Sequence, residues 1–203
     1  LVIRRGKPVD ALRQLFDEIR SEAIYAEEDF TPYARRRDTL IQKVLPLNLV
    51  HGQIVHHPKS IHKQDGRPYT VYTPYSKAWK AQLTKFKSQP APEQINTPKG
   101  IHSEPLPKHE SNSLFPAGEQ EALTRLEEFL HKRIYEYAEH RNHMDLDGTS
   151  SLSPYLRFGM LGLRQAVSAA RQAQVKARGE VSKRSAEVWL NELIWREFYI
   201  QIL

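Results

Sequence analysis

The sequence predicts a mixed fold, in which an α/β part is followed by an all-α part. Up to about residue 48, short apolar runs alternate with runs that have helical spacing. Residues 48–118 contain nine of the 13 prolines and six of the nine histidines, and they show little long periodicity. From Glu119 onwards apolar residues recur at helical spacing, and no strand pattern interrupts them. We therefore divide the chain into residues 1–48, 49–118 and 119–203.

The first part alternates between strand and helix patterns. Residues 2–4 and 23–26 are short apolar runs typical of strands, and residues 8–21 have apolar side chains on one helical face. Thr31, which precedes Pro32, is suited to cap a second helix that extends to about Leu45. This order of strand, helix, strand and helix predicts a parallel α/β sheet, in which sites lie at the carboxyl ends of strands.

The other two parts show different patterns. Residues 49–118 are typical of an interdomain connection, with one patterned piece at 69–83 that predicts a turn entering a helix. The third part predicts a helix from Glu119 and further helices near 152–161, 163–177 and 185–203. A strand pattern opens the chain without a lead-in, and a helical pattern continues to its last residue. We therefore expect an internal fragment of a longer protein.

The composition is that of an ordinary globular protein, with 39% hydrophobic and 27% charged residues. The sequence has no cysteine, which excludes disulfides, thiolate metal sites and cysteine nucleophiles. It has neither an apolar run long enough to cross a bilayer nor a signal-peptide pattern, so we expect a soluble, cytoplasmic protein. The net charge is +6, and residues 31–110 carry 13 basic and five acidic side chains. A polyanionic partner and a solvated basic linker would both account for this excess.

A run rich in hydroxyl groups precedes one of the predicted helices. It reads Gly148, Thr149, Ser150, Ser151, Leu152, Ser153, Pro154, and its proline is suited to a first helical turn. Free backbone N–H groups at the start of a helix, together with hydroxyl donors, form a site for phosphate. An ordinary helix N-cap with additional serines would show the same pattern.

The last predicted helix combines large aromatic and charged side chains. Trp189, Glu192 and Arg196 are spaced so that they share roughly one helical face, and Trp195 lies nearby but offset. An aromatic ring beside a carboxylate and a guanidinium can form a pocket for a planar ring with polar edges. An amphipathic core helix with an Arg–Glu surface pair would also fit this spacing.

The combination and order of these motifs resemble the DNA photolyase/cryptochrome family, and most of all its microbial class I members that cleave cyclobutane pyrimidine dimers. The resemblance covers nearly the whole chain. It is carried by AEEDFTPYARRRD at 26–38, VYTPYSKAWKAQL at 71–83, Tyr137 with Arg141, GTSSLSPYLRFG at 148–159 and WLNELIWREFY at 189–199. It implies the back part of a Rossmann-like parallel α/β antenna domain, a long connector and the first part of a helical FAD-binding domain.

The resemblance implies FAD as the cofactor, held within the helical part. Tyr137 and Trp189 match positions that contact the flavin. The run that matches the diphosphate-binding segment consists of Thr149, Ser150, Ser151, Leu152 and Ser153. This assignment agrees with the local chemistry, since a diphosphate favours the positive end of a helix. Phe129 and Tyr135 are expected to be packing residues instead.

The same resemblance assigns Glu192 and Trp195 to the lesion, as the residues that contact the flipped-out dimer. Arg141, Arg196 and Tyr199 would contact damaged DNA. The implied activity is that of a deoxyribodipyrimidine photo-lyase, a carbon–carbon lyase. Reduced FAD passes an electron to the dimer under light, the ring bonds break, and the electron returns.

Two further features of the sequence concern additional ligands. Glu28 matches a carboxylate that contacts a reduced folate antenna, methenyltetrahydrofolate, although the adjacent Glu27 stands where a common form of the family has asparagine. No metal site is expected. The histidines of the connector lack supporting carboxylate spacing, namely His51, His56, His57 and His62.

Three alternatives remain beside dimer repair. A cryptochrome-like flavin photoreceptor shares the fold, but it has no need of the lesion-binding groups Glu192 and Trp195. A (6-4) photolyase would use pocket histidines that this sequence lacks, and a plain nucleic-acid-binding helical module would need no hydroxyl-rich run. We expect a monomer, associated with the nucleoid when it binds DNA. The 203-residue chain alone is expected not to repair DNA, and to hold flavin weakly or not at all.

Overall fold

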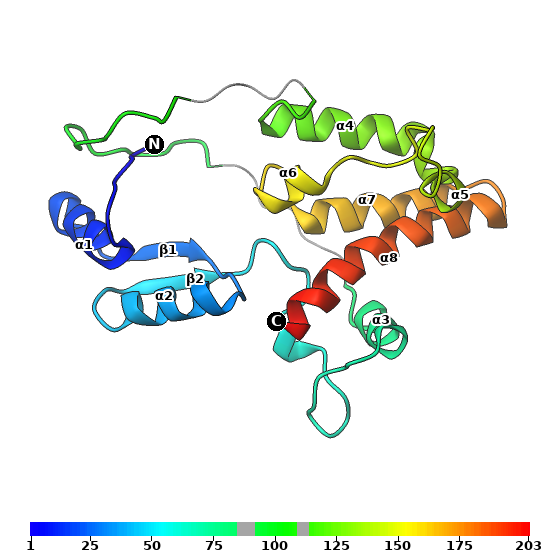
Figure 1. The fold of residues 1–203 in the computed structure, drawn as a ribbon, viewed down its shortest axis with the longest axis horizontal. Coiled ribbons are helices and arrows are strands. Elements are labelled where there is room, and N and C mark those ends of the chain that lie inside the picture. Colours follow the sequence, from blue (N-terminus) through cyan, green and yellow to red (C-terminus); the bar gives the residue numbers. More distant parts are fainter. Residues whose placement is uncertain (85–91, 109–113) are drawn as a thin grey trace. The chain divides into compact units, whose positions relative to one another are not determined.

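A computed structural model describes residues 1–84, 92–108 and 114–203 (Figure 1). These residues form two compact units, one from 1–50 with 92–108 and the other from 51–84 with 114–203. The α/β plus all-α class predicted from the sequence is confirmed. Residues assigned to the connector contribute to both units, and the three-part division at 48 and 118 stays a prediction. No helix among the described residues is long and apolar enough to cross a membrane.

The first unit is built from two helices and two strands. In chain order these are α1 (Pro8–Ile19), β1 (Ile24–Glu27), α2 (Pro32–Gln42) and β2 (Leu47–Val50). Thr31 caps α2 as predicted, because its side chain accepts a hydrogen bond from the Ala34 N–H at 3.3 Å. The two strands pair in parallel, which confirms the predicted parallel sheet. The buried centre of the unit consists of Ile41, Leu45 and Leu47, with apolar side chains from α1 and both strands packed around it.

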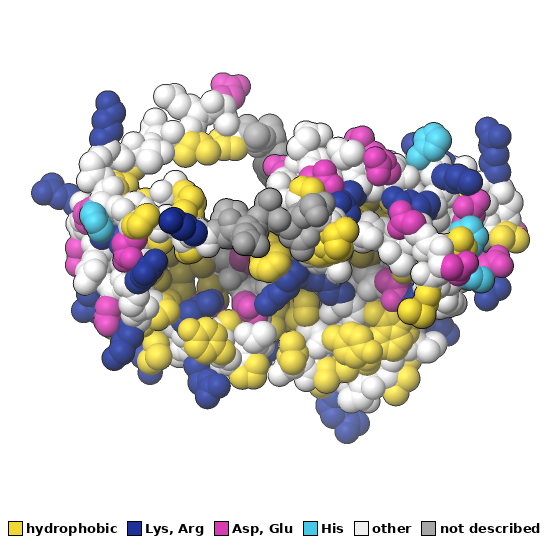
Figure 2. Space-filling model, turned by 45° about the horizontal axis from the view of Figure 1, so that its top comes forward, with side chains coloured by type: hydrophobic (Ala, Val, Ile, Leu, Met, Phe, Trp, Pro, Cys, Tyr) yellow, Lys and Arg dark blue, Asp and Glu magenta, His cyan; other side chains and the backbone are white. Residues whose placement is uncertain are grey.

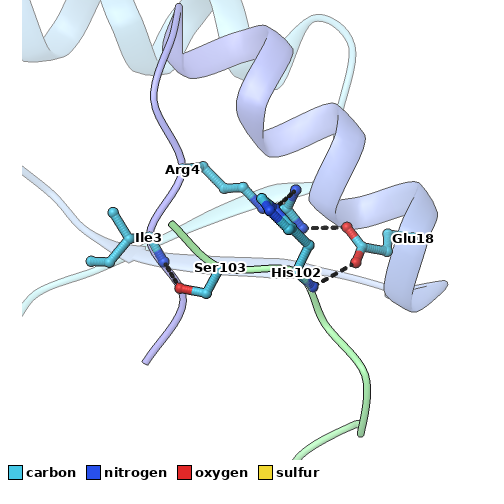
Figure 3. Close-up of polar contacts among 5 residues, drawn as sticks. All are labelled: Ile3, Arg4, Glu18, His102 and Ser103. Atoms are coloured by element: carbon cyan, nitrogen blue, oxygen red, sulfur yellow. Dashed lines mark hydrogen bonds and ion pairs between the residues drawn. The ribbon is translucent and has the colours of Figure 1, made fainter. Parts of the chain in front are cut away.

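The strand predicted at residues 2–4 is wrong, and the second strand of the sheet, β2, was not predicted. Residues 1–5 instead run beside residues 102–104 through mixed contacts (Figure 3). The Ile3 N–H donates to Ser103 Oγ at 2.9 Å, and the Ile3 carbonyl accepts from the Glu104 N–H at 3.0 Å. Glu18 accepts from the Arg4 guanidinium and, at 3.1 Å, from the His102 N–H. Most of the hydrogen bonds between these two segments use side-chain acceptors instead of the backbone carbonyls of a β-ladder. The apolar residues 2–4 therefore do not form a strand.

The second unit is helical. Its longer helices are α3 (Tyr72–Ala81), α4 (Glu119–His131), α7 (Leu163–Lys176) and α8 (Glu180–Ile202). Its short elements are the 3₁₀ turns Pro58–Ser60 and Arg133–Tyr135 and the helices α5 (Tyr137–His140) and α6 (Ser153–Arg157). The helix predicted over 152–161 is shorter than expected, because Gly159 adopts a left-handed φ of 71° just after it ends. Helix α8 begins five residues earlier than predicted, at Glu180 rather than at Ser185.

Helix α8 lies at the centre of the second unit, and α3, α5 and α7 pack against it. The small side chains of Ala166, Ala170 and Ala173 are buried on one face of α7, and small side chains allow helices to pack closely. One continuous hydrophobic core joins these helices to α4. The core therefore fixes α8 from several sides. As a result, the backbone positions of the polar residues on α8 are fixed as well.

Glu197 of α8 is a buried charge within this core, only 2% exposed. Its carboxylate accepts from the Trp79 indole N–H at 2.5 Å, from the His56 N–H at 3.3 Å and from the Val55 N–H. Burial raises the pKa of Glu197, and the three donors act in the opposite direction by favouring the carboxylate. These bonds tie residues 55–56 and helix α3 to helix α8.

We expect Glu197→Leu to lower the free energy of unfolding by at least about 3 kcal/mol, because three buried donors lose their acceptor. Glu197→Gln retains one acceptor oxygen and should lie between the wild type and Glu197→Leu. Urea denaturation followed by helical circular dichroism would measure both. Glu127→Leu, an exposed change on α4, serves as the control. A loss no larger than that of the control would contradict the structural role of Glu197.

Candidate functional site

Tyr137 and Trp189 lie in the core of the helical unit. The two side chains are 7% and 2% exposed. Phe129 joins them, with its ring centroid 5.8 Å from that of Tyr137 and 5.0 Å from that of Trp189. The sequence assigned Phe129 to packing, and the structure places it as the link between the two residues predicted to contact a flavin.

An ion pair connects α5 with α8 beside this aromatic group. The Arg141 guanidinium donates to the Glu192 carboxylate, and it also lies over the Tyr137 ring at 5.4 Å from the centroid. The pair is half-buried, with side chains 31% and 36% exposed. The bond to Glu192 raises the pKa of Arg141, and burial raises that of Tyr137. Three of the predicted site residues, Tyr137, Arg141 and Glu192, are thus brought together.

Helix α5 owes its position to a polar anchor on α8. The Ala138 N–H donates to the buried hydroxyl of Ser185 at 2.9 Å. This bond satisfies one of the N–H groups that a helix leaves free at its start. Because Tyr137 and Arg141 are four residues apart, both project from the same side of this short helix. The anchor therefore fixes the side from which Arg141 meets Glu192.

Trp195 lies one turn further along α8 and is half-buried. Tyr72 of α3 stacks on its ring, with centroids 3.7 Å apart and planes 4° apart. Tyr199 is 61% exposed and lies on its other flank along the helix, 5.5 Å from the Trp195 centroid. Arg196 donates to the Gln53 carbonyl at 2.5 Å, so it is engaged with the chain segment before α3. The sequence analysis missed Tyr72, although it lies within a segment that carried the resemblance.

The hydroxyl-rich run forms a loop that is fixed by packing on α5 and by hydrogen bonds from Arg133. Gly148 packs so closely on α5 that a Cβ atom would lie 2.4 Å from the His140 carbonyl oxygen. Arg133 donates to the Thr149 carbonyl at 3.3 Å and to the Asp147 carboxylate. Leu152 is buried and precedes α6 as its N-cap, with no side-chain hydrogen bond to the helix. The serine side chains are therefore not used to cap α6.

A hollow of about 410 Å³ opens beside this loop. Its polar lining includes Ser150, Ser151, Arg125 and Arg133 together with Glu121, Glu128 and Asp147. Each guanidinium has a carboxylate partner, since Arg125 bonds to Glu121 at 2.6 Å and Arg133 to Asp147. The hydroxyl groups are therefore the donors that fit a phosphate here, because both guanidinium groups are already paired and three carboxylates share the lining.

The remaining predicted site residue, Glu28, belongs to the α/β unit. It directly follows β1, and its N–H donates to the Val50 carbonyl at 2.9 Å. It lies at the carboxyl end of this strand, where sites are expected in parallel sheets. On the face drawn in Figure 2, basic side chains are scattered among acidic and apolar ones.

We expect Gly148→Ala to lower the free energy of unfolding by about 1–3 kcal/mol, because the added methyl group would overlap the His140 carbonyl. Gly162→Ala is the matched control, since the atom nearest to its Cβ would be 4.0 Å away. The control should cost less than Gly148→Ala, at most about 1 kcal/mol, because Gly162 is the N-cap of α7 and alanine is a poorer N-cap than glycine. Thermal or urea denaturation would compare the two variants, and equal effects would contradict the close packing of the loop on α5.

Comparison with known proteins gives similarity along the whole chain. Residues 1–96 match the family model described as DNA photolyase. A deoxyribodipyrimidine photo-lyase of Synechococcus sp. is 34% identical, over 98% of this chain and 45% of its own length. One from Thermus thermophilus is 32% identical, over 100% of this chain and 45% of its own length. An uncharacterised 31.6 kDa protein of another Synechococcus strain is 36% identical, over 98% of this chain and 74% of its own length.

Solved structures agree with these sequence matches. The bacterial class III photolyase of Agrobacterium tumefaciens superposes with a TM-score of 0.87 at 25% identity, over 100% of this chain and 45% of its own. A cryptochrome of Synechocystis sp. shares the fold, with a TM-score of 0.79 at 23% identity over the same shares. The chain thus spans less than half the length of the photo-lyases that it matches. Sequence similarity along nearly all of its residues, combined with the shared fold, shows that the chain belongs to the DNA photolyase family.

Proposed function

We propose that the protein repairs cyclobutane pyrimidine dimers in DNA under light, by electron transfer from reduced FAD. The observation that carries this proposal is the Arg141–Glu192 ion pair, which joins Arg141, lying over the Tyr137 ring, to α8 at the turn between Trp189 and Trp195. The relatives named as photo-lyases are more than twice as long as this chain. The proposal therefore applies to a protein of their length, and the 203 residues alone are expected not to repair DNA.

In this proposal the cofactor is held by the loop at 149–153 and by the aromatic residues beside it. The hydroxyl groups of Ser150 and Ser151 in the hollow would donate to the diphosphate, and Arg125 and Arg133 would offset part of the negative charge of the carboxylates in the lining. Tyr137 and Trp189 would contact the ring system. FAD, when bound, supplies light absorption and the transferred electron.

Glu192 and Trp195 would contact the pyrimidine dimer. The Trp195 ring offers an apolar face to a base turned out of the duplex, and the Glu192 carboxylate can accept a hydrogen bond from the edge of a base. The ion pair with Arg141 bears on the chemistry, because a carboxylate alone would oppose negative charge on the dimer. Arg141 offsets that charge while Glu192 keeps its role as acceptor. Arg196 and Tyr199 would contact the DNA strand near the lesion.

A cryptochrome-like flavin photoreceptor is the second candidate, since the chain shares its fold with the Synechocystis cryptochrome at a TM-score of 0.79. Such a protein would hold the cofactor in the same way and would have no use for lesion contacts. In both cases Glu28, at the carboxyl end of β1, would contact a reduced folate antenna such as methenyltetrahydrofolate. We propose a monomer that acts on damaged DNA in the cytoplasm.

We expect the full-length protein to show flavin absorbance and to remove thymine dimers from oligonucleotides only under light. Glu192→Gln and Trp195→Leu should retain the flavin and reduce repair at low substrate concentration by at least about tenfold each, because the loss of about 1.4 kcal/mol of binding energy weakens the affinity for the lesion tenfold. Glu187→Gln is the control, because Glu187 lies on the same helix and bonds to Lys80 instead.

Bound flavin without repair would favour the photoreceptor. A protein without flavin would contradict both candidates. Repair that survives both Glu192→Gln and Trp195→Leu would contradict the assignment of the lesion to these side chains.

A further inference from the structure

We propose that Tyr72 is a positioning residue for lesion recognition, which covers one face of the Trp195 ring and holds the ring in a single orientation. This inference rests on the proposed repair of pyrimidine dimers and assigns a role to a residue outside α8. It concerns the helical unit alone, because Tyr72 and Trp195 both belong to it.

The two rings meet in a nearly complete face-to-face stack. Their centroids are 3.7 Å apart and their planes are inclined by 4°. Phe198 closes another side of Trp195 edge-on, at 5.5 Å and 77°. An indole has two faces, and one of them is occupied by Tyr72. A base can therefore stack only on the part of the ring that Tyr72 leaves uncovered, next to the exposed Tyr199, whose ring is stacked on Trp195 at 5.5 Å and 27°.

Tyr72 is fixed at both ends of its side chain. Its hydroxyl donates to the Asn191 carbonyl at 3.0 Å, one helical turn before Trp195 on α8. Burial raises the pKa of this hydroxyl, with Glu192 as the next contribution, so it remains a donor at neutral pH. The side chain consequently spans from the backbone at Asn191 to the indole of Trp195, and this bond adds to the stack in holding its position.

Helix α3 holds Tyr72 in place through a second attachment. Trp79 lies seven residues after Tyr72, on the same face of the helix, and donates to the buried Glu197 at 2.5 Å. Tyr75, between them, packs on Phe198 at 5.1 Å. With contacts at both ends of α3, the Tyr72 ring is presented to Trp195 as part of a rigid helix rather than as a mobile side chain.

A fixed indole matters for binding because ordering a side chain at the moment of binding lowers affinity. Trp195 has no hydrogen bond of its own among the described residues that would set its plane. Glu192 lies three residues before it, on a neighbouring part of the α8 surface. If the ring plane is held by Tyr72, a stacked base arrives with its edge at a fixed position relative to the Glu192 carboxylate.

The test uses the full-length protein in the dark, with an oligonucleotide that contains one thymine dimer and the same oligonucleotide without it. We expect Tyr72→Leu to lower the preference for the dimer by about fivefold, within the range of aromatic pair contributions, and to leave the affinity for undamaged DNA unchanged. Tyr72→Phe keeps the ring and should retain the preference. Tyr69→Leu is the control, since Tyr69 packs on Tyr75 and is not in contact with Trp195.

A second measurement reports on the ring itself. With 5-fluorotryptophan incorporated, the ¹⁹F signal of Trp195 can be assigned by its loss in Trp195→Phe. It should be a single narrow line in the wild type and in Tyr72→Phe, and broadened or split in Tyr72→Leu. Tyr72→Met, which fills the space without a ring, replaces Tyr72→Leu if that variant does not fold.

An unchanged dimer preference in the ring-less variants would overturn the inference, whatever the ¹⁹F spectrum shows. An equal loss in Tyr72→Phe would also overturn it, because the effect would then come from the hydroxyl group rather than from the stack. A wild-type protein without any preference for the dimer would instead refute the proposed repair function, so the two failures can be told apart.

Discussion

The arrangement of the helical unit depends on a single buried carboxylate. Glu197 accepts hydrogen bonds from the Trp79 indole and from the N–H groups of Val55 and His56, and all four residues lie in or at the edge of the core. An unpaired charge at this depth would cost several kcal/mol, so the three donors and the acceptor can be buried only together. This requirement selects one position for α3 and for the segment before it, whereas apolar packing alone would tolerate several.

Helix α8 contributes side chains both to the core and to the proposed site, because other elements cover most but not all of its sides. Trp189, Leu193 and Ile194 are buried in it, while Glu192 and Trp195 remain half-exposed on the strip between the packed neighbours. Residues on this strip cannot shift without moving the core. The polar and aromatic side chains that we assign to a lesion thus lie on the helix against which α3, α5 and α7 pack, which suits a reaction that depends on distance and orientation.

The loop at 148–152 and the ion pair between α5 and α8 are coupled through α5. Gly148 packs on the His140 carbonyl at one end of this short helix, and Arg141 follows directly. The Ser185 hydroxyl anchors the other end. Because α5 has only four residues, its own hydrogen bonds cannot stabilise it. Its position comes from these three contacts, and they bring the proposed cofactor loop and the proposed lesion contacts into one framework.

The sequence by itself determined the existence of the longer helices of the second unit, the Thr31 cap and the family, because periodicity, capping and motif order are local properties. It also indicated Tyr137, Arg141 and Glu192, and the structure joins them. It did not predict that the helix from Glu119 ends at His131, before a 3₁₀ turn and α5. The sequence did not predict β2 or the irregular pairing of residues 3–5 with 103–104, since strand formation depends on partners far along the chain. The Tyr72–Trp195 stack and the Trp79–Glu197 bond were also decided only by the tertiary structure. Each contact joins residues more than 110 positions apart. The contacts are necessary because the glutamate is buried and the tyrosine is half-buried, and no local sequence pattern encodes the burial of these residue types.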